Sequence, residues 1–536
     1  MATHDELKEA IRTYAYKSAR ETLIIGPDEE RRDAWLFDFR ALLLQPTWLN
    51  TYAELFWAQY QHKYPFQVCG METAAISLVA AIVMKGVERG TPVNGLFVRK
   101  SRKRTGLLKQ IEGTPTKDPV ILVDDLINTG GTFKKQLAVL QDANLSVIDI
   151  FVMLSFKEPR TYQDFTAKNI EVYSVFSLKD LNVAFLPSPD LSQEMKPLWK
   201  FSAPNPSYNI VVQKSAPVID GEKIYFGSDA GIFYALEQTT GEVVWTHNIG
   251  KFPDGKGILS SPALYNNTVY FGAYDGNVYA LNTDTGTQQW VYSDADWVGS
   301  SPVIAPEHNL LFIGLEFGLW GKRGGLVALD LSTGKQVWQH RTPALTHGSP
   351  LYIPEENMVV VGSNDAVLYA YEAHTGKELW QYGTAGEVKS SPTYDAESRL
   401  IFFGTLGGRM YAVSPQGTPI YSKEIGPVYS TPTVQDSTVY VASLDKTIYA
   451  FEASTGQKKW ERQTNGRIFA SPLMIGDSLW IGSNDGRLYE IDIQNGKIKK
   501  FFQTSERIVN KIAYNTNKGM LFLPTQANEI YCLKNI

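Results

Sequence analysis

The chain has 536 residues, 51 lysines and arginines against 56 aspartates and glutamates, a formal net charge of −5 and two cysteines. This length predicts several domains with sizeable cores, and two cysteines cannot build the disulfide framework of a small secreted protein. The slight acidity argues against nucleic acid or an anionic membrane as a partner. The first ten residues lack an apolar core and no apolar run reaches about 18 residues, so we expect a cytoplasmic protein with no membrane span.

The composition changes near residue 197. Nine of the 43 glycines and three of the 12 tryptophans lie in residues 1–197, which leaves 34 and nine for the rest. Three prolines in residues 185–197 predict a short, stiff linker. We therefore expect one domain over residues 1–185, a linker over 186–197 and a second domain over 198–536.

Residues 1–185 alternate between helix-like and strand-like patterns. Helices are predicted over 5–20, 48–60, 73–87 and 132–142, and strands over 66–69, 93–98, 120–123 and 146–154. Short apolar strands separated by helices are typical of an α/β fold with a mainly parallel sheet. Ligands of such folds bind beyond the carboxyl ends of the strands, so the loops there are candidate sites.

The strand at 120–123 leads into the strongest chemical motif, Asp-Asp-Leu-Ile-Asn-Thr-Gly-Gly-Thr at 124–132. Backbone N–H groups at the start of the following helix would cradle a phosphate, hydroxyls would add donors, and glycines would let the backbone approach closely. Asp124 and Asp125 suit the vicinal hydroxyls of a ribose phosphate and would offset a carbocation at its anomeric carbon. The alternative is a solvated pair of acids before an ordinary turn. The order of acids, hydroxyls and glycines after a buried strand favours phosphoribosyl binding.

Five basic residues lie in Arg99–Arg104, directly after the strand at 93–98. A solvated basic patch or a nucleic-acid contact would also explain such a run. Its position between two strands, in an acidic chain, favours a loop that closes over an anionic substrate.

Three segments together resemble a known family. The motif at 120–132 resembles the phosphoribosyl-pyrophosphate (PRPP) motif of type I phosphoribosyltransferases, and its surroundings are similar to the orotate branch. Val68–Ala81 resembles that family's pyrophosphate loop, Phe97–Gly113 its catalytic hood, and Leu36–Arg40 its Tyr-Phe-Asp-x-Arg element. The resemblance implies that PRPP is bound by Gly70, Met71, Glu72, Thr73 and Ala74 in the loop, by Arg99, Lys100 and Lys103 in the hood, and by Asp124, Asp125, Asn128, Thr129, Gly130, Gly131 and Thr132 in the motif.

The resemblance also implies a reaction. PRPP would transfer its phosphoribosyl group to a nitrogen of a nucleobase-like acceptor and release pyrophosphate, with Lys103, Asp124 and Asp125 as catalytic residues. Mg²⁺ would be carried by PRPP rather than by a dedicated protein site, and the N-terminal domain would form a homodimer whose hoods serve the neighbouring subunits. Thr105 stands where orotate enzymes carry a hood histidine, and residues 155–160 lack the arginine arrangement expected to hold orotate's carboxylate. The identity of the acceptor is therefore open.

Residues 198–536 repeat with a period of about 40 residues. Each repeat has a Tyr-Ala-Leu-like strand, and in the first seven a turn glycine follows, with an aromatic residue four positions later except after Gly496, where Lys500 replaces it. A Ser/Ala/Thr-Pro pair opens seven repeats, at Pro217, Pro262, Pro302, Pro350, Pro392, Pro432 and Pro472, with Ile512 in the eighth position. This pattern predicts an eight-bladed β-propeller. The last repeat ends after its third strand, so we expect the strand at 198–201 to pair with 529–533 and close the ring.

These repeats resemble the pyrroloquinoline-quinone-type (PQQ-type) propeller family. The resemblance implies a fold more than a function, because the vicinal cysteine pair of quinone-dependent dehydrogenases is absent. We expect an orotate-type phosphoribosyltransferase whose propeller is a binding or regulatory platform for a partner protein or ligand. The alternatives are a non-enzymatic PRPP or nucleotide sensor whose propeller recruits a partner, and a quinone-dependent oxidoreductase, which the missing cysteines disfavour.

Overall fold

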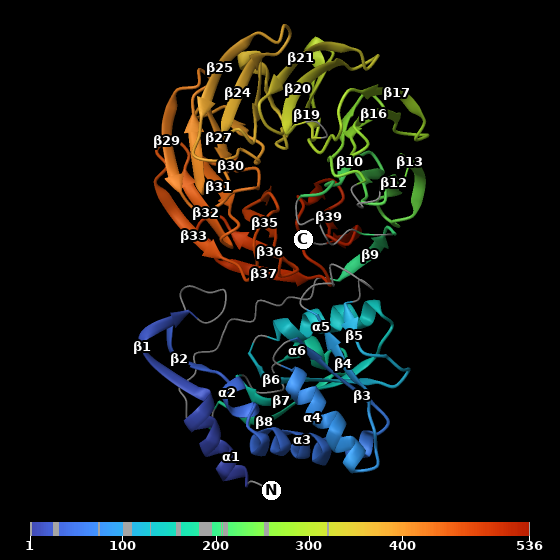
Figure 1. Ribbon diagram of the computed structural model, residues 1–536, viewed down its shortest axis with the longest axis vertical. Coiled ribbons are helices and arrows are strands. Elements are labelled where there is room, and N and C mark those ends of the chain that lie inside the picture. Colours follow the sequence, from blue (N-terminus) through green and yellow to red (C-terminus); the bar gives the residue numbers. More distant parts are fainter. Residues whose placement is uncertain are drawn as a thin grey trace. The chain divides into compact units, whose positions relative to one another are not determined.

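The computed structural model describes residues 3–24, 32–72, 75–99, 110–128, 130–156, 162–178, 180–181, 196–204, 206, 213–250, 257–318 and 321–534, and the side chains of all these except 16–36, 163 and 164. The chain divides into two compact units, Met1–Glu194 with Gln503–Ser505, and Met195–Phe502 with Glu506–Ile536. Figure 1 shows the first unit in blue to cyan and the second, a propeller, in green to red. None of the helices in the described ranges is long and apolar enough to cross a membrane.

The first unit is built on a six-stranded sheet of order β5-β4-β3-β6-β7-β8, in which all neighbours are parallel except β5 and β4. Its strands are β3 (Gln67–Met71), β4 (Gly95–Val98), β5 (Ile111–Glu112), β6 (Val120–Ile127), β7 (Val147–Ser155) and β8 (Glu171–Ser177). Its helices are α1 (His4–Ala10), α2 (Arg40–Leu43), α3 (Pro46–Tyr60), α4 (Ile76–Glu88), α5 (Gly131–Asp142) and α6 (Gln163–Thr166), with short turns at η1 (Ile11–Ala15) and η2 (Gln61–Lys63). The predicted α/β fold with a mainly parallel sheet is confirmed.

Helices cover both faces of this sheet. Ile121 and Val123 of β6 lie in the core that includes residues of α3 and α4, whereas Leu122 lies in the core that includes residues of α5. A parallel sheet covered on both sides needs apolar residues at every position, which is why β6 begins as a continuous apolar run. Ligands can then reach the sheet only at the ends of its strands.

Three element boundaries differ from the sequence-based prediction. The helix predicted over 5–20 is wrong in its second half, because β1 (Tyr16–Ile24) pairs antiparallel with β2 (Arg32–Phe37). The long-range pairing of a hairpin overrides a local helical pattern there. The helix predicted from 73 begins at Ile76, and β6 continues to Ile127 rather than ending at 123. The two acids of the motif therefore belong to the strand itself.

The second unit consists of eight four-stranded antiparallel sheets, which confirms the eight-bladed propeller (Figure 1). The first four blades contain β10 (Val218–Asp220), β11 (Lys223–Gly227), β12 (Ile232–Glu237), β13 (Val243–Asn248); β14 (Ala263–Tyr265), β15 (Thr268–Gly272), β16 (Asn277–Asn282), β17 (Gln288–Ser293); β18 (Val303–Ala305), β19 (Leu310–Phe317), β20 (Arg323–Asp330), β21 (Gln336–Thr342); and β22 (Leu351–Ile353), β23 (Met358–Gly362), β24 (Val367–Glu372), β25 (Glu378–Gly383). The other four contain β26 (Thr393–Asp395), β27 (Leu400–Gly404), β28 (Arg409–Val413), β29 (Pro419–Glu424); β30 (Thr433–Gln435), β31 (Thr438–Ala442), β32 (Thr447–Glu452), β33 (Lys458–Gln463); β34 (Leu473–Ile475), β35 (Ser478–Gly482), β36 (Arg487–Asp492), β37 (Ile498–Gln503); and β38 (Ala513–Asn515), β39 (Met520–Pro524), β40 (Glu529–Lys534), β9 (Pro197–Ser202).

The eighth blade combines strands from both ends of the unit. β9 precedes the first blade in the sequence but pairs antiparallel with β40, with Trp199 opposite Cys532 and Phe201 opposite Ile530. This pairing covers the edge of β40 that would otherwise be unpaired, and it completes the last blade of the ring.

An aromatic residue of every outer strand except β37, a tryptophan in all of them but one, packs on the turn glycine of the next blade. A Cβ on Gly286 would lie 2.5 Å from the Trp245 ring, and the Trp245 indole N–H donates to the Thr283 carbonyl at 2.9 Å. The exception at Lys500 has a structural reason. The eighth blade has no turn between its third and fourth strands, because β40 and β9 come from opposite ends of the unit. It therefore has no turn glycine on which an aromatic side chain of the seventh blade could pack. Lys500 instead pairs with Glu490 at 3.2 Å.

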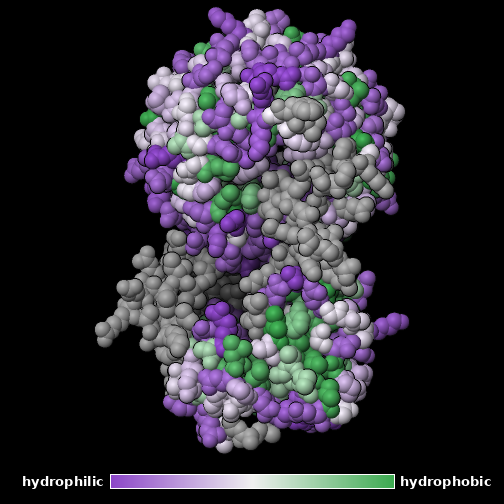
Figure 2. All heavy atoms as spheres, viewed as in Figure 1, coloured by the Kyte–Doolittle hydropathy of each residue, from purple (hydrophilic) through white to green (hydrophobic). Residues whose placement is uncertain are grey.

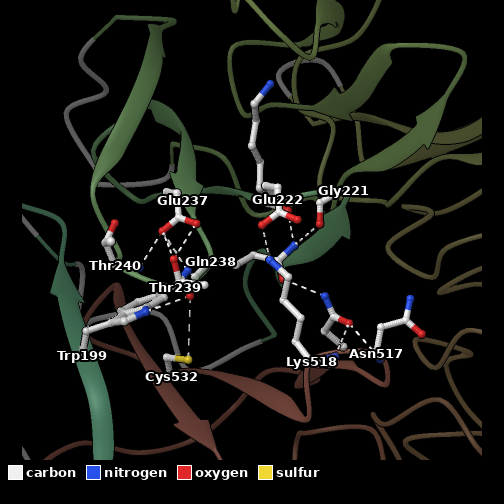
Figure 3. A network of polar contacts seen from close by, with 12 residues as sticks. Trp199, Gly221, Glu222, Glu237, Gln238, Thr239, Thr240, Asn517, Lys518 and Cys532 are labelled. Atoms are coloured by element: carbon white, nitrogen blue, oxygen red, sulfur yellow. Dashed lines mark hydrogen bonds and ion pairs between the residues drawn. The ribbon is translucent and has the colours of Figure 1, made fainter.

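Figure 3 shows the polar contacts between the eighth blade and the first. The Trp199 indole N–H donates to the Gln238 carbonyl at 2.9 Å, and the Asn515 amide donates to the side-chain oxygen of Gln238 at 2.7 Å. Lys518 forms an ion pair with Glu222 nearby. Gln238 therefore joins the first blade to both β9 and the end of β38.

Candidate functional site

Three predicted site segments meet at one edge of the first unit's sheet. β3 lies between β4 and β6 and runs parallel to both, with Met71 opposite Val98 and Cys69 opposite Leu122. The carboxyl ends of these three strands therefore share an edge. The predicted pyrophosphate loop follows β3, the hood follows β4, and the PRPP motif spans the end of β6 and the start of α5.

Arg99 is held between two carboxylates at this edge. Its guanidinium lies 3.5 Å from Glu72 and 3.1 Å from Glu112, and the Glu72 backbone N–H donates to the Val98 carbonyl at 3.0 Å. The structure thus brings together Glu72 and Arg99, from two different predicted segments. An incoming pyrophosphate would compete with both acids for this guanidinium. Thr73, Ala74, Lys100, Lys103 and Thr129 lie outside the described residues.

The two acids of the motif lie where β6 leaves the core. Asp124 is 7% exposed and accepts a hydrogen bond from the Asp125 backbone N–H at 3.0 Å, while Asp125 is half-buried. The Tyr52 hydroxyl, from α3, donates to the Asp124 backbone carbonyl at 3.0 Å. The strand end that carries both acids is therefore anchored to a buried helix.

Burial dominates the electrostatics of this pair. It raises the pKa of the Asp125 carboxyl, and hydrogen bonds from Leu126 and Asp124, together with the charge of Arg40, partly offset the effect. The pKa of Tyr52 is raised well above its ordinary value by burial and then by the charges of Asp124 and Asp125, so this hydroxyl remains a donor. An ionised Asp125 is costly here, and a cation arriving with a substrate would be favoured.

The turn into α5 opens on a glycine in the left-handed conformation. Gly130 has φ +78°, and a Cβ there would lie 2.8 Å from the Phe165 ring, so glycine meets both requirements of the position. The first backbone N–H groups of α5 have no partners within the helix. The side-chain oxygen of Asn128 is buried with no hydrogen-bond partner among the described residues. The Tyr162 hydroxyl braces the turn by donating to the Ile127 carbonyl at 3.1 Å.

Gly70 has a packing role in the structure. A Cβ there would lie 2.2 Å from the Ala75 Cβ and 3.3 Å from the Val123 carbonyl oxygen. A side chain at this position would therefore push α4 away from the sheet. Backbone contacts from residues 70–74 to a pyrophosphate stay a prediction.

The sequence analysis assigned no role to Arg40 and Tyr52, two residues that border the acids of the motif. Arg40 lies close enough to lower the pKa of Asp125, and its Nε donates to Asp38 at 3.0 Å. The Phe-Asp-x-Arg resemblance was the signal that could have found it. Tyr52 gave no signal, because the apolar pattern of its helix already explains a buried tyrosine.

The acids fit an oxygen-binding metal. Carboxylate oxygens are ligands that Mg²⁺ prefers, and Asp124 and Asp125 supply them at this edge. The described residues hold no group of three or more histidine, cysteine, aspartate or glutamate side chains that could bind a metal. A Mg²⁺ here would therefore take further ligands from substrate and water.

The fold and this edge define a phosphoribosyltransferase-like α/β domain joined to a PQQ-like eight-bladed propeller. A family model described as "Outer membrane protein assembly factor BamB" matches residues 192–351, 322–398 and 364–513. These matches span residues 192–513, more than half of the chain, and the chain belongs to this propeller family.

Solved structures support the propeller fold. BamB from Moraxella catarrhalis aligns with a TM-score of 0.52 at 19% identity, over 64% of this chain and 98% of that one. A europium-containing methanol dehydrogenase aligns with a TM-score of 0.52 at 14% identity, over 61% of this chain and 84% of that one. At these identities the likeness concerns the fold alone.

The curated relatives match the remaining third of the chain. An orotate phosphoribosyltransferase of Bradyrhizobium sp. (strain BTAi1) is 25% identical over 185 residues, 33% of this chain and 97% of the relative. The enzyme of the same name from Methanosphaera stadtmanae is 25% identical over 151 residues, 28% of this chain and 82% of the relative. The N-terminal unit is thus similar to nearly the whole length of such an enzyme.

Proposed function

We propose that the first unit transfers a phosphoribosyl group from PRPP to a nitrogen of a nucleobase-like acceptor of the orotate type. The junction of β6 and α5 carries this proposal: two adjacent acids lie near the end of a central strand, a left-handed Gly130 opens a helix, and the Asn128 side-chain oxygen between them has no partner among the residues that the structure describes. The likeness to orotate phosphoribosyltransferases over nearly their full length supports it. The propeller would serve as a binding or regulatory platform.

The residues divide the reaction between them. The N-terminus of α5 would hold the 5-phosphate, and Asp124 and Asp125 would hold the ribose hydroxyls and stabilise positive charge at the anomeric carbon. The bond from that carbon to pyrophosphate breaks, a bond to the acceptor nitrogen forms, and the acceptor loses a proton. Arg99, Lys100 and Lys103 would stabilise the leaving pyrophosphate, and a closed hood would exclude water. Mg²⁺ bound with PRPP would neutralise part of the pyrophosphate charge.

Pyrophosphate release from PRPP and Mg²⁺, measured across nucleobases that include orotate, tests the proposal. Lys103→Ala should lower turnover by roughly 10²–10³-fold and change PRPP affinity far less, because its charge acts on the leaving group. Lys117→Ala removes an exposed lysine of the same unit and should leave turnover unchanged. Unchanged turnover in Lys103→Ala would contradict the hood assignment.

A PRPP or nucleotide sensor is the second candidate. Thr105 in place of a hood histidine, and the missing acceptor-side arginines, favour it. Measurable PRPP binding with no pyrophosphate release for any base would establish the sensor and reject the transferase.

We also propose a cytoplasmic homodimer that associates through the first unit. Ile76, Met84 and Val87 are exposed on one side of α4, and Figure 2 shows hydrophobic side chains gathered over this helix. An apolar patch on an otherwise polar surface is typical of an interface.

We also propose that the first domain ends at residue 185 and that the propeller begins at residue 198.

A further inference from the structure

Hydroxyl side chains join the blades of the propeller around its axis. The innermost strands of successive blades lie against one another, and the residue two positions before each strand is a serine or threonine in six of eight blades. The Ser301 hydroxyl accepts a hydrogen bond from the Ser261 backbone N–H at 2.9 Å, and the Ser349 hydroxyl accepts one from Ser301 at 2.9 Å. The same bond joins Ala216 to Ser261, Ser349 to Ser391, and Thr431 to Ser471, at 2.9–3.0 Å.

The eighth blade breaks this pattern with a lysine. Lys511 lies two residues before β38, where Ser471 stands in the seventh blade and Ala216 in the first. Its side chain is exposed, whereas Ser471 is buried. Protein nevertheless surrounds Lys511 closely enough that burial lowers the pKa of its ammonium group.

Lys511 is also the charge at this level of the ring that lacks a counterion. It has no hydrogen bond or ion pair within the described ranges. Basic side chains two residues further back in other blades are matched by acids: Lys214 with Asp229, His347 with Glu316 at 3.4 Å, and Lys389 with Glu387 at 2.9 Å. Within the described part of the chain, one positive charge in this ring of mainly hydroxyl-bearing positions is therefore uncompensated.

We propose that the axial end of the propeller binds a carboxylate group through the Lys511 ammonium and the neighbouring serine hydroxyls. A carboxylate has the single negative charge that one ammonium neutralises, and its two oxygens accept from both an ammonium and a hydroxyl. The Ser471 hydroxyl accepts from the Thr431 N–H and from the Gln213 amide at 3.3 Å, so neither of these bonds uses its own proton. The carboxylate could belong to a peptide C-terminus or to a small free acid.

Thermal unfolding of the full chain in sodium acetate, against sodium chloride of equal ionic strength, tests this site. Acetate at 100-fold its Kd should raise the unfolding temperature of the propeller by about 3–6 °C. Lys511→Ser, which installs the hydroxyl of the other blades, and Lys511→Met, which keeps the aliphatic stem, should both abolish the acetate-specific rise. Lys497→Ser removes an exposed lysine after a neighbouring turn and should retain it.

An acetylated tripeptide with a free C-terminus and its amidated counterpart distinguish the two sources. A Kd for the free-acid peptide at least 10-fold below that of acetate supports a chain terminus as the ligand. Equal affinities support a small acid, and in both cases the amidated peptide should not bind. An equal rise in the wild type and Lys511→Ser, or no rise in either, would overturn the proposal.

Discussion

Two opposing effects act on the pKa of the Asp125 carboxyl group. Burial raises its pKa, so the ionised form destabilises the folded unit, while Arg40 and the Leu126 and Asp124 hydrogen bonds reduce that cost. A charge held at a cost in the apo protein is typical of a site that becomes favourable only with its ligand. The neighbouring Tyr52, uncharged and buried, fixes the strand without adding charge.

Replacing Asp125 with asparagine should separate stability from function. With a raised folded-state pKa, the cost of Asp125 is absent at low pH and grows as pH rises through that pKa. Asp125→Asn should therefore unfold at a higher temperature than the wild type at pH 7, and the difference should shrink toward pH 4. Its pyrophosphate release should fall by roughly 10²–10³-fold.

Asp118→Asn is the matched control for activity, because Asp118 is a half-buried acid of the same unit that precedes β6, at the opposite end of that strand from Asp125. It should leave pyrophosphate release unchanged. A gain in stability for Asp125→Asn that is as large at pH 4 as at pH 7 would show that burial of the charge is not its cause.

Site residues are most directly predicted from sequence where they lie together in one short segment. Asp124, Asp125 and Gly130 stand in one short motif whose order of residue types indicates their site. Arg40 and Tyr52 lie more than 70 residues earlier, on helices or turns whose patterns serve packing equally well. Only the tertiary fold brings them to the acids.

At the scale of elements, blades depend on contacts between a tryptophan and a turn of the next blade. Gly241 illustrates the geometry, since a Cβ there would lie 2.6 Å from the Trp199 ring and φ is +74°. Trp199 belongs to β9, so this contact also fixes the strand that completes the eighth blade. The repeat itself signals the aromatic and the glycine, but not that they serve different blades.

Gly241→Ala should lower the free energy of unfolding of the propeller by about 2–4 kcal/mol. A left-handed conformation costs alanine about 1–2 kcal/mol, and the overlap with the indole adds to it. Gly221→Ala is the control, because Gly221 has φ +53° but no atom within 4 Å of a Cβ. Denaturant unfolding monitored by tryptophan fluorescence measures both. Equal losses in the two variants would show that the contact with Trp199 contributes nothing.

The first unit shows where element-level prediction fails. The segment 5–20 has a helical pattern, yet its second half forms β1 because β2 supplies a partner from beyond residue 31. Strand β6 runs on through two acids, since pairing with β7 continues to Ile127 and outweighs the low strand propensity of aspartate. Both errors come from non-local pairing, which local periodicity does not contain.

The whole molecule consists of two units with separate cores. Eight repeats of one supersecondary unit define a closed ring from sequence alone, because each repeat can bury its faces only against its neighbours. The ligand proposed for this ring depends on a position where the repeat is broken, Lys511. Repeats therefore predict the scaffold, and deviations from them carry the specific information.

Because the two units have separate cores, they should unfold in two calorimetric transitions, and PRPP should raise the temperature of one of them. PRPP with Mg²⁺ at 100-fold its Kd adds about 2.7 kcal/mol to the unit that binds it, a rise of about 5–10 °C for a unit of this size. The propeller transition should stay in place, and acetate should move it instead. Asp124→Asn should remove the PRPP-dependent rise, since that acid lies at the proposed ribose site, and should leave the propeller transition unchanged. A PRPP-dependent rise in the propeller transition, or its persistence in Asp124→Asn, would mean that PRPP binds elsewhere than at the end of β6.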